Sequence, residues 1–175
     1  MYVGRVIAGL SGSAGSLAAL RYAAAMARTE GAELIPVLAW MPPGGDLADR
    51  RFPCQELRVA WRKGAEDRLW GAISLAIGGP PDDVEFSPRL VRGEPGEVLC
   101  ALAVQPGDIL VIGTGRRGPG RLLGSSVSRY CLAHALCPVV AVPPSDLAVH
   151  VHGVHGWRLL HRAQPEDADL HAADV

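Results

Sequence analysis

Five short apolar runs alternate along this 175-residue chain with segments in which apolar residues recur at helical spacing. The runs predict buried strands at 3–10, 33–40, 84–91, 109–112 and 139–142. The segments between them predict helices, of which 57–77 is the longest and 125–136 the last. Such alternation favours parallel strands joined by right-handed crossovers, with helices on both faces of one sheet. The sequence therefore predicts an α/β fold.

Two stretches fit this pattern less well. Pro36 lies inside the second run, and proline is poorly tolerated in a central strand because it lacks the N–H that the ladder needs. Residues 46–53 are polar and show no periodicity, so we expect a loop there.

The composition of the chain narrows the classes of partner. A net charge of −1 at pH 7 gives no general attraction to nucleic acid or to an anionic membrane. No apolar run is long enough to span a bilayer, and the chain starts without the basic-then-apolar pattern of a signal peptide. The four cysteines form no CxxC pair, so reduced thiols are expected. We therefore expect a cytoplasmic protein with neither nucleic acid nor a membrane as its partner.

The character of the chain changes after Pro144. Residues 145–175 contain five of the six histidines and no sustained periodicity, so we expect one domain at 1–144 and a His-rich, flexible tail at 145–175. His150, His152 and His155 could collect a metal ion adventitiously, but a mobile segment lacks the fixed second shell that a metal site needs. No metal is expected beyond the magnesium that accompanies a nucleotide.

The stretch from Val111 to Ser128, VIGTGRRGPGRLLGSSVS, joins the fourth strand to the last helix through a glycine-rich loop. Backbone N–H groups in such a loop, together with a helix N-terminus, can hold a phosphate. The candidate residues are Gly113, Gly115, Gly118, Gly124, Ser125 and Ser126. They also suit a tight strand-to-helix connection capped by serine, and glycine spacing alone does not separate these two interpretations.

A second serine- and glycine-rich turn follows the first strand at Ser11, Gly12 and Ser13. In parallel sheets, ligands bind beyond the carboxyl ends of the strands, where both loops are expected to lie. Ala39, near the end of the second strand, is expected to line an adenine slot with its backbone; a small core residue is the alternative. Helix capping is the alternative role for the turn at Ser11 to Ser13.

Two segments resemble the universal stress protein family: RVIAGLSGSAGSLAALRYAAAMA after the start of the chain and GSSVSRYCLAHALCPVVAVP from Gly124. The resemblance covers residues 1–144. It implies a three-layer α/β/α open sheet of five parallel strands in the order 3-2-1-4-5, similar to the adenine-nucleotide alpha-hydrolases. It also implies a homodimer paired through the last strand, and ATP as the ligand of some members.

The ATP-binding members of that family carry Gly, two residues, Gly, nine residues, then Gly and Ser or Thr. Gly115 and Gly118 match the first half and Gly124-Ser125 the end, but only five residues separate Gly118 from Gly124. Ser11 stands where those members have an aspartate that contacts the nucleotide. One change shortens the phosphate cradle, and the other removes a carboxylate.

The residues therefore leave two functions open. The first is a stress-response protein that binds ATP or another adenine nucleotide as a regulatory ligand. The second is a dimeric signalling or interaction module of the same fold that binds no nucleotide. Enzymatic activity is not expected, because the chain shows no Ser-His-Asp arrangement, no paired catalytic carboxylates and no GK[ST] phosphate loop. His134, on the last helix, is expected to be structural.

Overall fold

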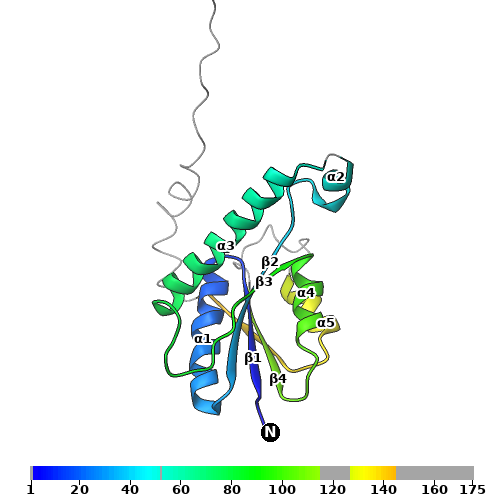
Figure 1. Ribbon diagram of the computed structural model, residues 1–175. Coiled ribbons are helices and arrows are strands. Elements are labelled where there is room, and N and C mark those ends of the chain that lie inside the picture. Colours follow the sequence, from blue (N-terminus) through cyan, green and yellow to red (C-terminus); the bar gives the residue numbers. More distant parts are fainter. Residues whose placement is uncertain (1, 52, 115–126, 145–175) are drawn as a thin grey trace, which may run out of the picture. The chain divides into compact units, whose positions relative to one another are not determined.

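The computed structural model describes residues 2–51, 53–114 and 127–144, and within them five strands form one parallel sheet (Figure 1). The strands are β1 (Arg5–Leu10), β2 (Glu33–Trp40), β3 (Arg89–Arg92), β4 (Asp108–Gly113) and β5 (Val139–Val142). Their order is β3-β2-β1-β4-β5, and every neighbouring pair is parallel. The α/β class, the number of strands and their order are therefore confirmed.

Helices cover both faces of this sheet, α1 and α3 on one face and α4 and α5 on the other (Figure 1). The described helices are α1 (Ala14–Glu30), α2 (Gly45–Arg51), α3 (Gln55–Ile77), α4 (Pro95–Leu102) and α5 (Val127–His134). Successive side chains of a strand point to opposite faces. In β1, Val6 and Ala8 accordingly pack with α1 and α3, whereas Ile7 packs with α4 and α5.

Helix α1 lies close to the sheet because its buried face consists largely of small residues. Its alanines Ala19, Ala23, Ala24 and Ala27 are almost fully buried. Ser13 caps its N-terminus, and Gly31 ends it in the left-handed conformation, with φ of 64°. The small face brings the first turn of α1 against the end of β4, beside the site described below.

The expectation of a loop at 46–53 is wrong, because helix α2 lies there. The side chain of Asp49 is 4% exposed and forms ion pairs with Arg58 of α3 and Arg92 of β3. Arg92 is distant from Asp49 in the sequence, and Arg58 belongs to the next helix. Helix α2 is thus held by ion pairs with other elements and lacks a periodic apolar face. A local apolar pattern therefore could not predict it.

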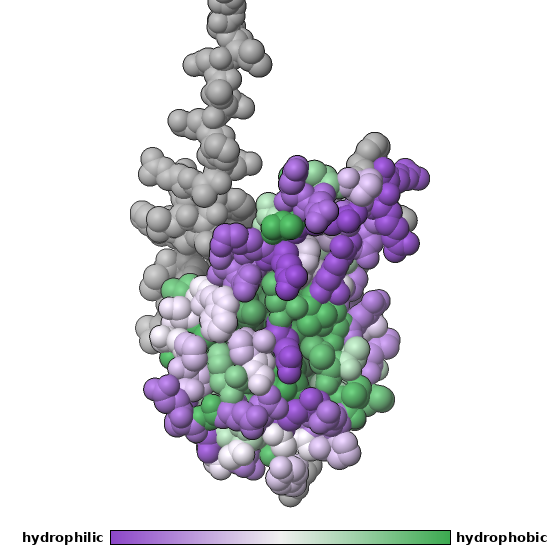
Figure 2. Space-filling view, in the orientation of Figure 1, coloured by the Kyte–Doolittle hydropathy of each residue, from purple (hydrophilic) through white to green (hydrophobic). Residues whose placement is uncertain are grey.

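The first half of α3 extends beyond the sheet. The buried residues of this helix are Ala65, Leu69, Ala72, Ile73 and Ala76, so its first ten residues bury none. Leu57 is 48% exposed, and the surface over α2 and the start of α3 is mostly hydrophilic (Figure 2). The four-residue spacing from Leu57 onward predicted the helix correctly, but only the second half of the helix faces the core.

Pro36 occupies a position where its missing N–H is tolerated. The N–H of Leu34 donates to the carbonyl of Glu85 (2.8 Å), so the even-numbered residues of β2 direct their backbone groups toward the β3 side. Regular pairing with β3 starts only at Val37, opposite Arg89. Pro36 therefore falls before this ladder begins, and β3 starts at Arg89 rather than at 84 as expected.

The expected tail at 145–175 lies outside the described residues, so its separation from a domain at 1–144 stays a prediction. Within the described parts of the chain, no helix combines the length and the apolar character that crossing a membrane requires.

Candidate functional site

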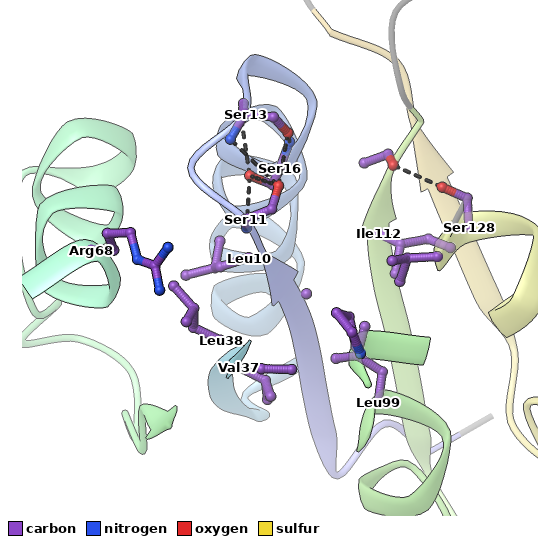
Figure 3. A pocket seen from close by; sticks show the side chains of 15 residues that line it. Leu10, Ser11, Ser13, Ser16, Val37, Leu38, Arg68, Leu99, Ile112 and Ser128 are labelled. Carbon is purple, nitrogen blue, oxygen red and sulfur yellow. Dashed lines mark hydrogen bonds between the residues drawn. The ribbon is translucent and has the colours of Figure 1, made fainter. Parts of the chain in front are cut away.

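A pocket of about 260 Å³ opens where β1, β2 and β4 end (Figure 3). β1 lies between β2 and β4, which is the place in the sheet where the winding direction changes. Open parallel sheets bind ligands at this switch point, beyond the carboxyl ends of the strands. Aliphatic side chains make up much of the lining: Leu10, Val37, Leu38, Leu99 and Ile112.

Three serine hydroxyls form a cluster at the end of β1. The hydroxyl of Ser11 lies 3.0 Å from that of Ser13 and 3.3 Å from that of Ser16. The Ser16 hydroxyl donates to the Ser13 carbonyl (2.9 Å), and the Ser13 hydroxyl accepts the N–H of Ser16 (3.3 Å). Ser13 is thus the N-cap of α1, and all three serines line the pocket. The cluster both starts the helix and forms the polar part of the pocket wall.

The opposite side of the pocket is built from the end of β4 and the start of α5. The Ser128 hydroxyl donates to the carbonyl of Gly113 (3.0 Å). A Cβ atom at Gly113 would overlap the backbone of Gly15, and one at Gly15 would lie 2.7 Å from the carbonyl oxygen of Thr114. The two glycines therefore let the first turn of α1 reach β4, so Gly113 has a structural role as well as a place in the lining.

Arg68 of α3 also lines the pocket, and its guanidinium points toward Leu10 and Leu38 (Figure 3). It is the one charged side chain among the described lining residues, and it forms no ion pair or hydrogen bond with any described residue. Arg68 was not predicted from the sequence, because an arginine on an amphipathic helix is usually solvated. Its place between Ala65 and Leu69 of the apolar stripe was the available signal.

The pocket brings together part of the predicted site. Ser11, Ser13, Ala39 and Gly113 all line it. Gly12 connects the two serines with a positive φ of 77°, a conformation that favours glycine. The other candidates, Gly115, Gly118, Gly124, Ser125 and Ser126, lie outside the described residues, and their role in binding stays a prediction.

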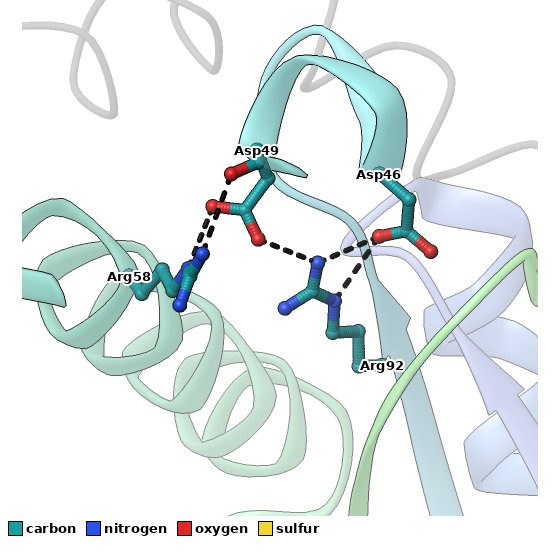
Figure 4. A network of polar contacts seen from close by, with 4 residues as sticks. All are labelled: Asp46, Asp49, Arg58 and Arg92. Atoms are coloured by element: carbon teal, nitrogen blue, oxygen red, sulfur yellow. Dashed lines mark hydrogen bonds and ion pairs between the residues drawn. The ribbon is translucent and has the colours of Figure 1, made fainter. Parts of the chain in front are cut away.

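An ion-pair network holds the elements beside the pocket (Figure 4). Arg92 of β3 pairs with both Asp46 and Asp49 of α2, and Arg58 of α3 donates to Asp49 at 2.7 Å. The hydrogen bonds from Arg58 and then from Arg92 lower the pKa of the Asp49 carboxyl. Arg92 also lies over the ring of Trp40, 5.9 Å from its centroid. The network therefore ties α2 and the start of α3 to the end of β2, next to Ala39.

Cys131 and His134 belong to α5, on the face of the sheet opposite to α3. Burial raises the pKa of the Cys131 thiol to about 12, with the Cys100 thiol as a further cause, so Cys131 is protonated at neutral pH. His134 Nδ1 lies 2.9 Å from the carbonyl oxygen of Tyr130, and its ring stacks on that of Tyr130. In the part of the chain that is described, no group of three or more His, Cys, Asp or Glu side chains could hold a metal ion.

Comparison with known sequences identifies the family. The sequence profile of the universal stress protein family matches residues 3–143. The chain belongs to the universal stress protein family. A universal stress protein from Synechocystis sp. is 39% identical over 66 residues, an alignment that covers 37% of this chain and 61% of that protein. The chain thus spans less than two thirds of the length of this relative.

Solved universal stress proteins share the fold. The protein from Lactobacillus plantarum superposes with a TM-score of 0.62 at 21% identity, covering 81% of this chain and 99% of that one. The protein from Archaeoglobus fulgidus gives 0.57 at 26% identity, covering 81% and 99%. A universal stress protein crystallised in complex with cAMP gives 0.53 at 28% identity, covering 83% and 100%.

Proposed function

We propose that this universal stress protein binds an adenine nucleotide such as ATP as a regulatory ligand, in the pocket at the ends of β1, β2 and β4. The pocket itself is the observation that carries the proposal. Its position, at the switch point of a parallel sheet, is the one in which such folds bind nucleotides.

The lining of the pocket suits the two ends of a nucleotide. Leu10, Val37 and Leu38 offer an apolar surface for a base, beside the backbone of Ala39. Serine hydroxyls and the guanidinium of Arg68 can donate to phosphate or sugar oxygens. The described lining residues include no carboxylate, so none of them repels a phosphate.

The relative crystallised with cAMP supports an adenine nucleotide in particular. It is 28% identical to this chain and superposes over 83% of it. Its ligand carries the adenine base and a phosphate, the two groups that the apolar and the polar lining are here proposed to hold.

The proposed role is binding rather than catalysis. The described lining residues supply hydroxyls and one guanidinium, but no carboxylate, imidazole or thiol that could act as a general acid or base. Magnesium is proposed to enter only with the nucleotide. The four free cysteines are in keeping with the reducing cytoplasm, where we place the protein.

Mass spectrometry of the ligand released when the purified protein is denatured tests this proposal, followed by calorimetric titration of the ligand-free protein with ATP and AMP. Ala39→Leu should weaken binding strongly, because the added side chain enters the slot. Ala60→Leu, on the exposed first half of α3, is the matched control and should bind as the wild type does. Absence of adenine nucleotide binding by the wild type at millimolar concentration would contradict the proposal.

A second candidate function, a dimeric interaction module that binds no nucleotide, is favoured by β5. This strand ends the sheet, and no described strand pairs with its outer edge. The carbonyls of Pro138 and Val142 accept N–H groups from β4, so the backbone groups of Ala141 point away from β4. An open edge of this kind can pair with that of a second copy about a two-fold axis.

Ala141→Pro tests the homodimer. The substitution removes an outward N–H but leaves the bonds to β4 intact, which is the form of proline that an edge strand tolerates. Light scattering should show a dimer for the wild type and a monomer for the variant. A monomeric wild type at tens of micromolar would reject pairing through β5.

A further inference from the structure

Arg68 lies on one side of the pocket, away from the end of β4. In Figure 3 its guanidinium faces Leu10 and Leu38, whereas Ser128 and Ile112 lie on the far side. Its nearest neighbours across the pocket are thus the aliphatic side chains where β1 and β2 end. A base bound over those side chains would have Arg68 beside it.

The guanidinium is also the one planar side-chain group that the described lining offers. No phenylalanine, tyrosine, tryptophan or histidine is found among those lining residues. A purine exposes two flat faces, and a guanidinium can cover one of them through combined stacking and cation–π attraction. Aliphatic side chains suit the other face but supply neither attraction.

We propose that Arg68 is a ligand-binding residue that stacks on the base of the nucleotide and presses it against the ends of β1 and β2. The inference rests on the proposed function and deepens it, because it assigns Arg68 to the base rather than to the phosphate. Arg68 acts as a cover over the apolar slot, and the serines and the β4 side remain for the sugar and phosphate.

The backbone that carries Arg68 is held on several sides, although its side chain is exposed and pairs with no described residue. Its neighbours Ala65 and Leu69 are buried against the sheet. The C-terminal end of α3 accepts hydrogen bonds from Arg21 of α1, at 2.9 Å to the carbonyl of Ala76. The N-terminal half is held by the pair of Arg58 and Asp49. The guanidinium is therefore positioned by a rigid helix yet free to meet a ligand.

Calorimetric titration of the full-length protein with AMP, adenosine and ribose 5-phosphate tests the assignment. Arg68→Met keeps an apolar stem of similar bulk but removes the charged plane. We expect the affinity of this variant to fall by about three- to tenfold for both AMP and adenosine, since both ligands carry the base. Any binding of ribose 5-phosphate should stay as in the wild type.

Arg62→Met is the matched control, because Arg62 is exposed on the same helix, does not line the pocket and has no described bond. It should change none of the three affinities. Both variants should unfold at the wild-type denaturant midpoint, which separates loss of binding from loss of fold.

The other outcomes overturn the assignment in distinguishable ways. Weaker binding of AMP with unchanged binding of adenosine would place the phosphate, not the base, at Arg68. Unchanged affinity for both ligands would remove Arg68 from the site while leaving the proposed function intact. A wild-type protein that binds neither AMP nor adenosine would overturn the proposed function and this inference together.

Discussion

Two arginines, Arg5 at the amino ends of the strands and Arg68 at the carboxyl ends, differ in whether their charge is paired with a described residue. At the amino ends of β1 and β4, Arg5 forms two hydrogen bonds with Asp108, of 2.8 and 2.7 Å, and a third with the carbonyl of Leu102. Asp108 also accepts the N–H of Gln105 at 2.8 Å. At the carboxyl ends, Arg68 faces a pocket without a described partner. The pair of Arg5 and Asp108 thus satisfies its charges internally, whereas Arg68 leaves a charge for a ligand.

This contrast separates stability from binding within one set of strands. Substitutions at the amino ends should change the free energy of unfolding and leave nucleotide affinity alone. Side chains that line the pocket and form no structural bond with described residues, such as Arg68, should show the reverse. The exception is the backbone contact of α1 with β4, which we expect to affect both the free energy of unfolding and the nucleotide affinity.

The largest expected effect tests that exception. Gly113→Ala should lower the free energy of unfolding by about 3 kcal/mol, because the added Cβ would overlap the backbone of Gly15 and lie 2.6 Å from the nitrogen of Ser16. Backbone cannot move aside as a flexible side chain can. Urea unfolding measures the loss.

Gly64→Ala is the control for adding a methyl group in place of a glycine hydrogen. A Cβ atom at Gly64 of α3 meets nothing within 4 Å. Alanine is the better helix former, so this variant should gain about 0.5–1 kcal/mol. Equal changes in the two variants would show that the close approach of α1 and β4 is unimportant.

Asp108→Asn comes next and probes the amino ends of the strands. The Asp108 side chain is 1% exposed, and the substitution removes the charge that Arg5 pairs with. We expect a loss of about 2 kcal/mol in the free energy of unfolding. Affinity for AMP should not change. Asp83→Asn breaks an exposed pair with Arg28 and should have far less effect. A weakened affinity for AMP in the Asp108 variant would break the separation of the two ends.

The same residue predicts a pH dependence. Burial raises the pKa of the Asp108 carboxyl, but the hydrogen bonds from Arg5 and from the N–H of Gln105 outweigh it, so the pKa is lowered. A lowered pKa in the folded state stabilises the protein above the unfolded value, about 3.9, and the stabilisation is lost as the pH falls through the folded pKa. The difference in unfolding free energy between wild type and Asp108→Asn should therefore be constant from pH 5 to 7 and shrink below about pH 4. A difference in unfolding free energy that stays constant down to pH 2 would show that the ion pair of Arg5 and Asp108 is not its cause.

Periodicity was a sound guide wherever a buried face repeats along the chain. Strands β2 and β5 match their predicted ranges because each is a compact apolar run between clear boundaries. Helix α2 could not be predicted this way, since its described side-chain contacts are ion pairs with α3 and β3. The start of α3 shows the converse, because Leu57 follows the apolar spacing but has no sheet beneath it.

Some residues of the candidate site could be predicted from the sequence, and others could not. Ser11, Ser13, Ala39 and Gly113 were found because they lie at or just after the ends of strands, and the rule that ligands bind at strand ends needs only the sequence. Arg68 comes from the middle of a helix, and its place in the pocket depends on how far α3 reaches over β1 and β2. The local sequence pattern does not show how far a helix extends over neighbouring strands.

The smallest expected effect concerns Ser13, where capping and binding overlap. Its hydroxyl accepts the N–H of Ser16 and also lines the pocket. Ser13→Ala should cost about 1 kcal/mol of unfolding free energy, and Ser13→Gly only a few tenths, because glycine is itself an acceptable N-cap. Both variants lose the hydroxyl. If the hydroxyl contacts the ligand, titration should show AMP affinity reduced equally in both, although their stabilities differ. Affinity that falls with stability, more in the alanine than in the glycine variant, would assign Ser13 to the helix alone and narrow the binding surface to Ser11, Arg68 and the strand ends.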